Sequence, residues 1–258
     1  ATFVWREKNL GGYQPMAGNV PPADLTDVAL DNGCFTLGGM DFYYLDTHYT
    51  DVLISMNGVV RAGIPSVGLC PSATPANFPA NEPSDYQDNL LAPFWADLDL
   101  TGGNMYLVLT IHNGKPHTVI EWENVRLKAT NQRVSFQIWF EDGTDNIWFA
   151  YEPGFNTMLG TATPTATIGA ENLAGTEGVM YYRFSGTGSP SGTVPTGAVD
   201  VWVGLEPTVA TLGFKANATA GANSNITNEA TTTVSSTTNK AWANTRICGN
   251  ATVTQPKI

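Results

Sequence analysis

Apolar and polar residues alternate with a period of two between Leu91 and Tyr151, and this pattern strongly limits how the chain can fold. Gly-Gly, Asn-Gly and Asp-Gly pairs separate the alternating runs. Such alternation is typical of half-buried strands, and the glycine pairs favour tight turns between them. Helical periodicity is missing, apart from one turn expected near Pro83–Leu90. The sequence therefore predicts an all-β fold, an antiparallel, jelly-roll-like β-sandwich.

Strand candidates cover most of the chain before Pro207. Asn57-Gly58 joins two of them in a predicted hairpin, because both residue types tolerate the positive φ that a tight turn needs. The predicted strands are Ala1–Arg6, Cys34–Leu37, Asp41–Tyr44, Val52–Met56, Val59–Ala62, Leu91–Leu98, Asn104–His112, His117–Leu127, Arg133–Glu141, Asn146–Tyr151, Thr165–Ala170, Val179–Phe184 and Asp200–Glu206.

The composition of the chain shifts after Pro207, where Thr, Ala, Asn and Ser dominate. Alternation persists in places, which favours exposed strands over disorder. We therefore expect a β-sandwich domain over residues 1–206 and a strand-rich extension over residues 207–258. The extension is short for an independent sandwich, so it is interpreted either as a β extension of the main domain or as part of an immunoglobulin-like repeat.

The charge of the chain argues against polyanionic partners. Charged residues make up 14% of the sequence, and 23 acidic against 12 basic residues give a formal net charge of −11. Binding of phosphates requires clustered Lys and Arg, and the densest basic group here is only Arg126, Lys128 and Arg133. Nucleic acid and anionic membrane surfaces are therefore not expected as partners. No apolar run is long enough to predict membrane insertion.

Three cysteines occur, Cys34, Cys70 and Cys248, and none belongs to a C-x-x-C pair. A zinc ribbon or thioredoxin-like site is therefore not expected. In an exported protein two of the three would pair. Pairing of Cys34 with Cys70 closes the shorter loop and is the predicted disulfide. The alternative is that Cys248 links the C-terminal extension to the main domain.

Five short motifs follow one another in the central part of the chain, with a sixth upstream. They are PFWADLD (93–99), EWENV (121–125), SFQ (135–137), Asp142-Gly143 and WFAY (148–151), preceded by SMNG (55–58). Their order resembles the nidogen-like (NIDO) domain of extracellular matrix and surface proteins. Similar phrases occur in C-terminal regions of secreted bacterial subtilisin-like proteases. The resemblance implies a secreted or cell-surface module for adhesion or an accessory role, without catalytic activity.

Asp97 and Asp99 are two residues apart on a predicted strand, so their side chains are expected on one face. Asn104 follows the Gly-Gly turn next along the chain. Ca²⁺ takes six to eight oxygen ligands, and these three residues are the predicted calcium ligands. If so, Asp97→Ala should lower the melting temperature only when calcium is present. The alternative is a solvated outer face of an edge strand, where aspartates oppose aggregation.

Aromatic residues are the predicted ligand-binding side chains. Neighbours such as Phe94 and Trp95 point to opposite faces of a strand, so not every ring can face one core. An exposed ring can stack on a sugar or anchor a protein partner. The alternative is that the rings fill the core between two sheets, or lie under the loop at residues 63–88. The residues proposed for binding are Trp95, Trp122, Trp139 and Tyr44.

Glu121 and Glu123 also share a predicted strand face. A carboxylate pair roughly 7 Å apart suits glycoside hydrolysis, whereas a charged, solvent-facing strand is the simpler interpretation. The sequence contains no G-x-S-x-G motif, so a serine hydrolase is not expected. We therefore expect a non-catalytic extracellular module that binds a protein or a glycan. The alternatives are a secreted carbohydrate-active enzyme that uses Glu121 or Glu123, and a structural spacer in a surface stalk.

Overall fold

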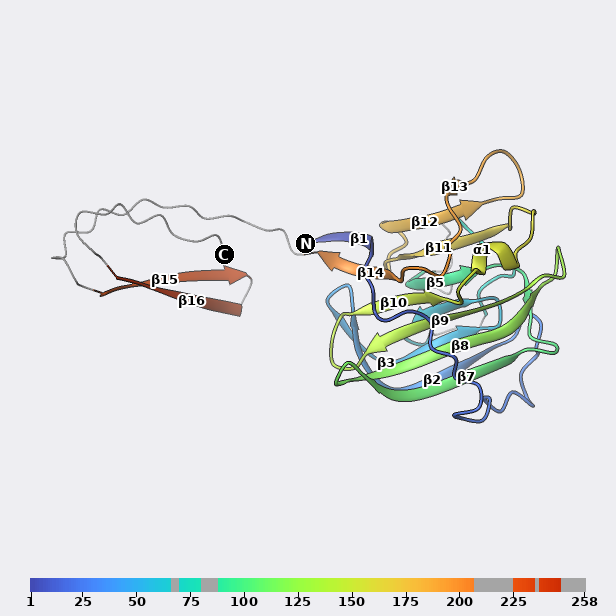
Figure 1. Cartoon of the computed structure of the whole chain (residues 1–258), viewed down its shortest axis with the longest axis horizontal. Coiled ribbons are helices and arrows are strands. Elements are labelled where there is room, and N and C mark those ends of the chain that lie inside the picture. The colour runs from blue at the N-terminus through green and yellow to red at the C-terminus, as the bar shows by residue number, and fades with distance from the viewer. Residues whose placement is uncertain (66–69, 80–87, 207–224, 235–236, 247–258) are drawn as a thin grey trace. The chain divides into compact units, whose positions relative to one another are not determined.

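The computed structural model describes residues 1–65, 70–79, 88–206, 225–234 and 237–246 (Figure 1). The chain divides into two compact units, Ala1–Pro207 and Thr208–Ile258. In its described residues, the first unit is a sandwich of two antiparallel β-sheets with one short helix, α1 (Phe155–Met158). The predicted antiparallel β-sandwich is therefore confirmed. The helical turn expected near Pro83–Leu90 lies largely outside the described residues, and Leu90 itself begins a strand.

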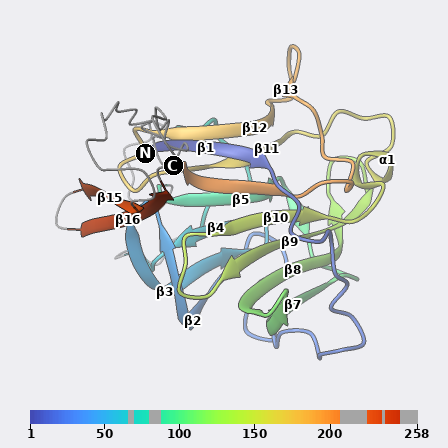
Figure 2. The ribbon, with the colours of Figure 1, turned by 60° about the vertical axis from the view of Figure 1, so that its left-hand side comes forward.

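Seven strands form the first sheet. Their order is β1-β14-β10-β9-β8, and both β6 and β7 pair with the remaining side of β8. The edge strand β7 is seen at the bottom of this sheet in Figure 2. The strands are β1 (Thr2–Glu7), β6 (Leu98–Asp99), β7 (Asn104–His112), β8 (Lys115–Leu127), β9 (Arg133–Glu141), β10 (Ile147–Tyr151) and β14 (Val201–Glu206).

Seven further strands form the second sheet, in the order β13-β12-β11-β5-β4-β3-β2. Its edge strand β2 contains the two predicted strands at residues 34–37 and 41–44, joined by an irregular register between Gly38 and Phe42. The strands are β2 (Cys34–Tyr44), β3 (Thr47–Ser55), β4 (Val59–Ala62), β5 (Leu90–Trp95), β11 (Ala166–Glu171), β12 (Gly178–Phe184) and β13 (Ser191–Gly192).

The strand predicted at Leu91–Leu98 is divided in the structure. Its first part is β5 in the second sheet, and its last residue opens β6 in the first sheet. The chain changes sheets at Ala96-Asp97, as strands do at the corners of sandwiches. The alternation that predicts one continuous strand therefore does not describe the directions of the side chains after Trp95.

The main core lies between the sheets and is formed by side chains of strands from both of them. Trp122 of β8 stacks on Phe136 of β9, with ring centroids 5.1 Å apart. Phe94 of β5 meets Phe136 edge to face at 5.6 Å, which joins the two sheets. The fully buried aromatic side chains include Trp122, Phe42, Phe94, Phe136, Phe140, Phe149, Phe155 and Tyr151.

Two smaller apolar clusters lie on the outer faces of the sheets. On the first sheet, Leu10 and Met16 of the segment that follows β1 cover Trp139 and Val119. On the second sheet, Phe78 covers Trp95, with their ring centroids 5.9 Å apart. Each sheet thus has aromatic side chains on both faces, and irregular segments at residues 8–20 and 71–79 bury the outer ones.

The Asn57-Gly58 turn joins β3 to β4, as the sequence predicts. Only Gly58 has a positive φ, of 73°, and a Cβ there would lie 2.1 Å from the carbonyl oxygen of Phe94. Asn57 is buried and has a tertiary role: its side-chain oxygen accepts a 3.0 Å hydrogen bond from the Leu98 N–H. The turn therefore positions the crossing between the sheets.

Cys34 and Cys70 form a disulfide, with their Cα atoms 5.5 Å apart. The predicted pairing is confirmed, and Cys248 lies outside the described residues. The bond links the start of β2 to the segment that runs toward the cover over Trp95. It closes a loop across a sequence separation of 36 residues.

The second unit contains a two-stranded antiparallel hairpin of β15 (Asn225–Val234) and β16 (Thr237–Arg246). The expected strands of the C-terminal extension are present there. Whether the extension belongs to an immunoglobulin-like repeat stays a prediction. Among the described residues, no helix has the length and apolar character that crossing a membrane demands.

Candidate functional site

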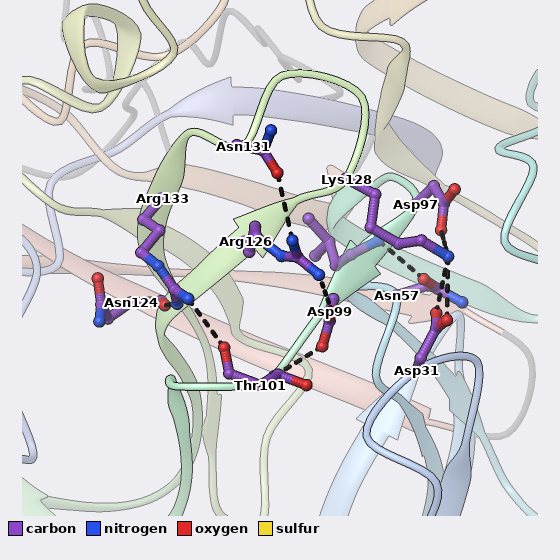
Figure 3. Close-up of polar contacts among 11 residues, drawn as sticks. Asp31, Asn57, Asp97, Asp99, Thr101, Asn124, Arg126, Lys128, Asn131 and Arg133 are labelled. Carbon is purple, nitrogen blue, oxygen red and sulfur yellow. Dashed lines mark hydrogen bonds and ion pairs between the residues drawn. The ribbon is translucent and has the colours of Figure 1, made fainter.

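The two aspartates predicted to bind calcium lie where the chain passes from β5 to β6 (Figure 3). Asp99 is buried, accepts a 2.7 Å hydrogen bond from the Thr101 backbone N–H and pairs with Arg126. The Asp97 side chain is 47% exposed, and its carboxylate lies 3.4 Å from the Lys128 ammonium. The prediction of one shared strand face is wrong, because Asp97 precedes β6 and the two carboxylates meet different cations.

Asn104, the third predicted ligand, donates a 2.7 Å hydrogen bond to the Glu123 carboxylate across the β7–β8 pair. Within the described ranges, no three His, Cys, Asp or Glu side chains are grouped to hold a metal ion. Because each predicted ligand has a different partner within the protein, Asp97, Asp99 and Asn104 do not fit the oxygen cage that Ca²⁺ requires. Calcium binding itself stays a prediction, which melting of the Asp97→Ala variant with calcium and with a chelator would test.

The basic residues around these aspartates hold the corner of the sandwich together. Lys128 lies 3.0 Å from Asp31 as well as beside Asp97, so it links the β8–β9 turn to the segment before β2. Arg133 donates to the backbone oxygens of Thr101, at 2.8 Å, and of Asn124. The densest basic group in the sequence is thus engaged within the domain (Figure 3).

Replacing Asp99 with asparagine should flatten the pH dependence of stability in acid. Hydrogen bonds from Thr101, followed by the one from Arg126, lower the pKa of Asp99 to about 2. A lowered pKa stabilises the fold above the unfolded value of about 3.9, and this contribution is lost as the pH falls toward about 2. We expect Asp99→Asn to cost about 1–2 kcal/mol at pH 7 and little near pH 2, measured by urea unfolding.

Asp97→Asn is the matched control for this prediction, because its ion pair is half exposed and such pairs contribute little. It should leave both the midpoint and its pH dependence close to those of the wild type. Parallel pH profiles for Asp99→Asn and the wild type would contradict the assigned role of Asp99.

All four aromatic residues predicted to bind a ligand are buried. Trp122 lies in the main core, where its indole N–H donates to the Ser55 carbonyl oxygen at 3.2 Å. The Tyr44 hydroxyl donates to the Glu171 carbonyl oxygen at 2.7 Å. Trp95 and Trp139 lie on the outer faces, beneath the two covering segments. The prediction that these rings form an exposed binding surface is wrong, because local segments cover the positions that face away from the main core.

The segment at residues 8–20 is held on the first sheet by buried polar groups. One carboxylate oxygen of Asp200 accepts hydrogen bonds from three successive backbone N–H groups, those of Leu10, Gly11 and Gly12, at 2.7–3.2 Å. The Gln137 amide donates to the Gln14 carbonyl oxygen at 2.6 Å. These contacts satisfy the backbone of an irregular segment that lies on an apolar surface.

Glu121 lies beneath the same segment and has no exposed surface. It accepts hydrogen bonds from the Tyr13 hydroxyl, the Met16 N–H and the Gln137 amide. Burial raises the pKa of Glu121, so its ionisation disfavours folding as the pH rises above the ordinary carboxyl range. The expected solvent-facing strand is therefore wrong at Glu121, and the arrangement does not expose a Glu121–Glu123 pair to a sugar substrate.

A family model described as NIDO related matches residues 7–201, which is most of the chain. The chain belongs to the NIDO-related family. The match covers the sandwich from the end of β1 to the start of β14, so the motifs that resemble a nidogen-like domain are part of a longer agreement. No curated protein and no solved structure matches the chain. The secreted-protease context stays a prediction.

An exposed apolar surface on this NIDO-related domain was not foreseen from the sequence. Leu109 and Ile111 of β7 are 78% and 70% exposed, the highest values among the large hydrophobic residues in the described part of the chain. Alternation identifies β7 as a strand, and Met105 and Leu107 on the same face enter or touch the main core. The run Asn104–His112 has no Lys, Arg, Asp, Glu or Pro. Because charges and proline usually protect an edge strand from pairing, their absence is the signal in the sequence for an unprotected edge.

Proposed function

We propose that this NIDO-related domain is a non-catalytic extracellular module that binds a protein partner. Membership of the family supports an extracellular module, and the Cys34–Cys70 disulfide is typical of proteins that mature in an oxidising compartment. The proposal includes an adhesive or accessory role, such as that of an appended domain in a secreted peptidase.

The exposed apolar surface of β7 carries this proposal. Leu109 and Ile111 are separated by one residue, so they present neighbouring aliphatic side chains on one face of the strand. Contiguous exposed apolar surface is a recurrent feature of protein-interaction sites. Sugars, in contrast, are recognised largely by stacking on aromatic rings, and Tyr43 is the single aromatic residue among the exposed large hydrophobics of the described chain. A protein is therefore preferred to a glycan as partner.

Electrostatics support a neutral or cationic partner rather than nucleic acid. The formal net charge is −11, and Arg6, Lys115, Arg126 and Lys128 each pair with a carboxylate of the domain. Paired cations are not available to neutralise phosphates. We therefore do not expect binding to DNA, RNA or anionic lipid.

An array of purified extracellular proteins, printed beside a glycan array, tests the proposed function. The wild type should bind at least one protein and no glycan, and Leu109→Ser with Ile111→Ser should weaken that binding at least tenfold. Leu173→Ser is the matched control, because Leu173 is also an exposed leucine but lies between β11 and β12.

Three results would count against this function. Binding to glycans alone would make the domain a carbohydrate-binding module. Polysaccharide hydrolysis that Glu121→Gln abolishes would make it an enzyme, despite the burial of that carboxylate. Blank protein and glycan arrays would favour the structural spacer.

A further inference from the structure

One half of β7 has backbone hydrogen-bonding groups that point away from its own sheet. The Met105 carbonyl oxygen accepts a 2.7 Å hydrogen bond from the Ala23 N–H, so the backbone groups of Met105 face outward from β8. Outward and inward residues alternate along an antiparallel edge strand. The backbone N–H and C=O groups therefore also point away from β8 at Leu107, Leu109 and Ile111. Within the described chain, no hydrogen bond joins these backbone groups to another segment.

The other half of this edge is covered by the segment that leads into β2. Ala23 makes the backbone contact at Met105, and Leu25 and Val28 pack on the main core. From Leu107 onward, no backbone hydrogen bond in the described chain joins β7 to a segment other than β8, and this part of the strand, Leu107–His112, is the open half. Six residues of strand span about 20 Å, the length of an ordinary strand.

A shallow hollow of about 140 Å³ adjoins the open half of β7. Leu107 and Leu109 form one wall, and Leu37 and Met40 of the neighbouring edge strand β2 form the other. Gly38 and Gly39 lie between these two β2 residues, and a Cβ at either glycine would meet no neighbouring atom. The irregular part of β2 therefore leaves space for side chains that enter alongside β7.

The residues that line this hollow are uncharged, and carboxylates lie near them. The Thr118 hydroxyl, which lies at the hollow, donates to the Asp142 carboxylate at 3.2 Å. Asp41 follows Met40 directly, and its side chain is 63% exposed beside His48. The nearby cation Lys115 pairs with Glu141 at 2.6 Å. An incoming segment therefore meets an apolar floor on a domain of net negative charge, which favours a segment with a net positive charge.

The other edges of the two sandwich sheets have features that discourage pairing, and β7 lacks them. β1 ends in the charged residues Arg6 and Glu7, β2 has an irregular register, and β6 and β13 contain only two residues each. Charges, bulges and short length are the usual protections of a sheet edge. β7 is long and uncharged, with its most exposed aliphatic side chains next to open backbone groups.

We propose that the open half of β7 accepts an extended segment of the partner protein as an additional strand. The segment carries apolar side chains at alternate positions, which lie against Leu109 and Ile111, and it has a net positive charge. Backbone hydrogen bonds to Leu107, Leu109 and Ile111 supply affinity, and the apolar contacts set the register. This inference specifies the binding mode of the proposed function and rests on it.

The test uses the full chain and a fluorescein-labelled peptide, Lys-Val-Thr-Val-Lys-Val-Thr, in fluorescence anisotropy. The control peptide, Lys-Lys-Thr-Thr-Val-Val-Val, has the same composition and charge without the alternation. The alternating peptide should bind at least tenfold more tightly than the control, and its binding should slow amide hydrogen exchange at Leu107, Leu109 and Ile111.

Leu109→Lys should weaken binding of the alternating peptide at least tenfold, because it adds a charge to the open edge. Leu173→Lys makes the same chemical change at another exposed leucine and should alter the affinity less than twofold. Leu109→Pro removes an outward-facing N–H while keeping the bonds to β8, and it should weaken binding as Leu109→Lys does. Unchanged melting temperatures would show that these variants fold.

Equal binding of the two peptides, or equal affinities of the two lysine variants, would overturn the proposed strand addition. So would a wild-type dimer in sedimentation equilibrium that Leu109→Lys converts to a monomer, because a second copy would then occupy the edge. Protein-array binding that persists in Leu109→Lys would leave the proposed function standing and reject only this mode, whereas a blank array would reject the function itself.

Discussion

Trp122→Ala is expected to lower the free energy of unfolding by about 4 kcal/mol. Trp122 is fully buried between the sheets, stacks on Phe136 with an interplanar angle of 15°, and donates to the Ser55 carbonyl oxygen of β3. Alanine would remove the ring, leave a cavity and strand a buried carbonyl group. For a domain of this size the melting temperature should fall by about 10 °C, measured by calorimetry.

Trp122→Phe is the control, because it keeps most of the apolar volume and loses the indole N–H. Its cost should be about 1–2 kcal/mol, clearly below that of alanine. Comparison of Trp122→Ala with Trp122→Phe also distinguishes a structural role of the ring from the ligand-binding role expected from the sequence. A Trp122→Ala variant that melts like the wild type but loses partner binding would show that the ring contacts the partner.

Removing the disulfide should have an effect of similar size. Cys34 and Cys70 close a loop across a sequence separation of 36 residues, and the chain-entropy relation then gives about 4 kcal/mol of stabilisation through the unfolded state. The double variant Cys34→Ser with Cys70→Ser should therefore melt about 10 °C below the wild type in the absence of reductant.

Reductant supplies the matched control for the disulfide prediction. Dithiothreitol should lower the melting temperature of the wild type to that of the double serine variant, and it should not change the variant. Cys248→Ser should melt as the wild type does if Cys34 and Cys70 are the pair that matters. A large loss for Cys248→Ser alone would mean that Cys248 takes part in a stabilising bond.

Strand positions were largely accessible from the sequence, because alternation and turn residues are local signals. Asn104–His112 and Arg133–Glu141 were predicted with the bounds that the structure has. The prediction at Leu91–Leu98 is wrong in one respect, since the chain changes sheets after Trp95. Alternation records that a residue is buried on one side or the other, but it does not record which sheet buries it.

Candidate site residues were harder to predict, because their environment comes from distant segments. The aromatic positions on the outer faces looked available for ligands, and residues 8–20 and 71–79 cover them. Glu121 looked solvent-facing, and Tyr13, Met16 and Gln137 enclose it. The exposure of Leu109 and Ile111 was not predicted at all, because alternation places them on one strand face without showing whether another segment covers that face.

The sequence by itself determined that this chain forms antiparallel strands, where most of them begin and end, which two cysteines were favoured to pair, and which family of extracellular domains it resembles. These properties can be predicted because the period of the apolar residues, the residue types in turns and the lengths of loops are local features of the sequence. Only the tertiary structure decided which apolar faces are covered, which carboxylates meet cations and which sheet edge stays open. Those outcomes depend on contacts between segments such as Asp200 and Leu10, far apart in the chain, which local patterns do not encode.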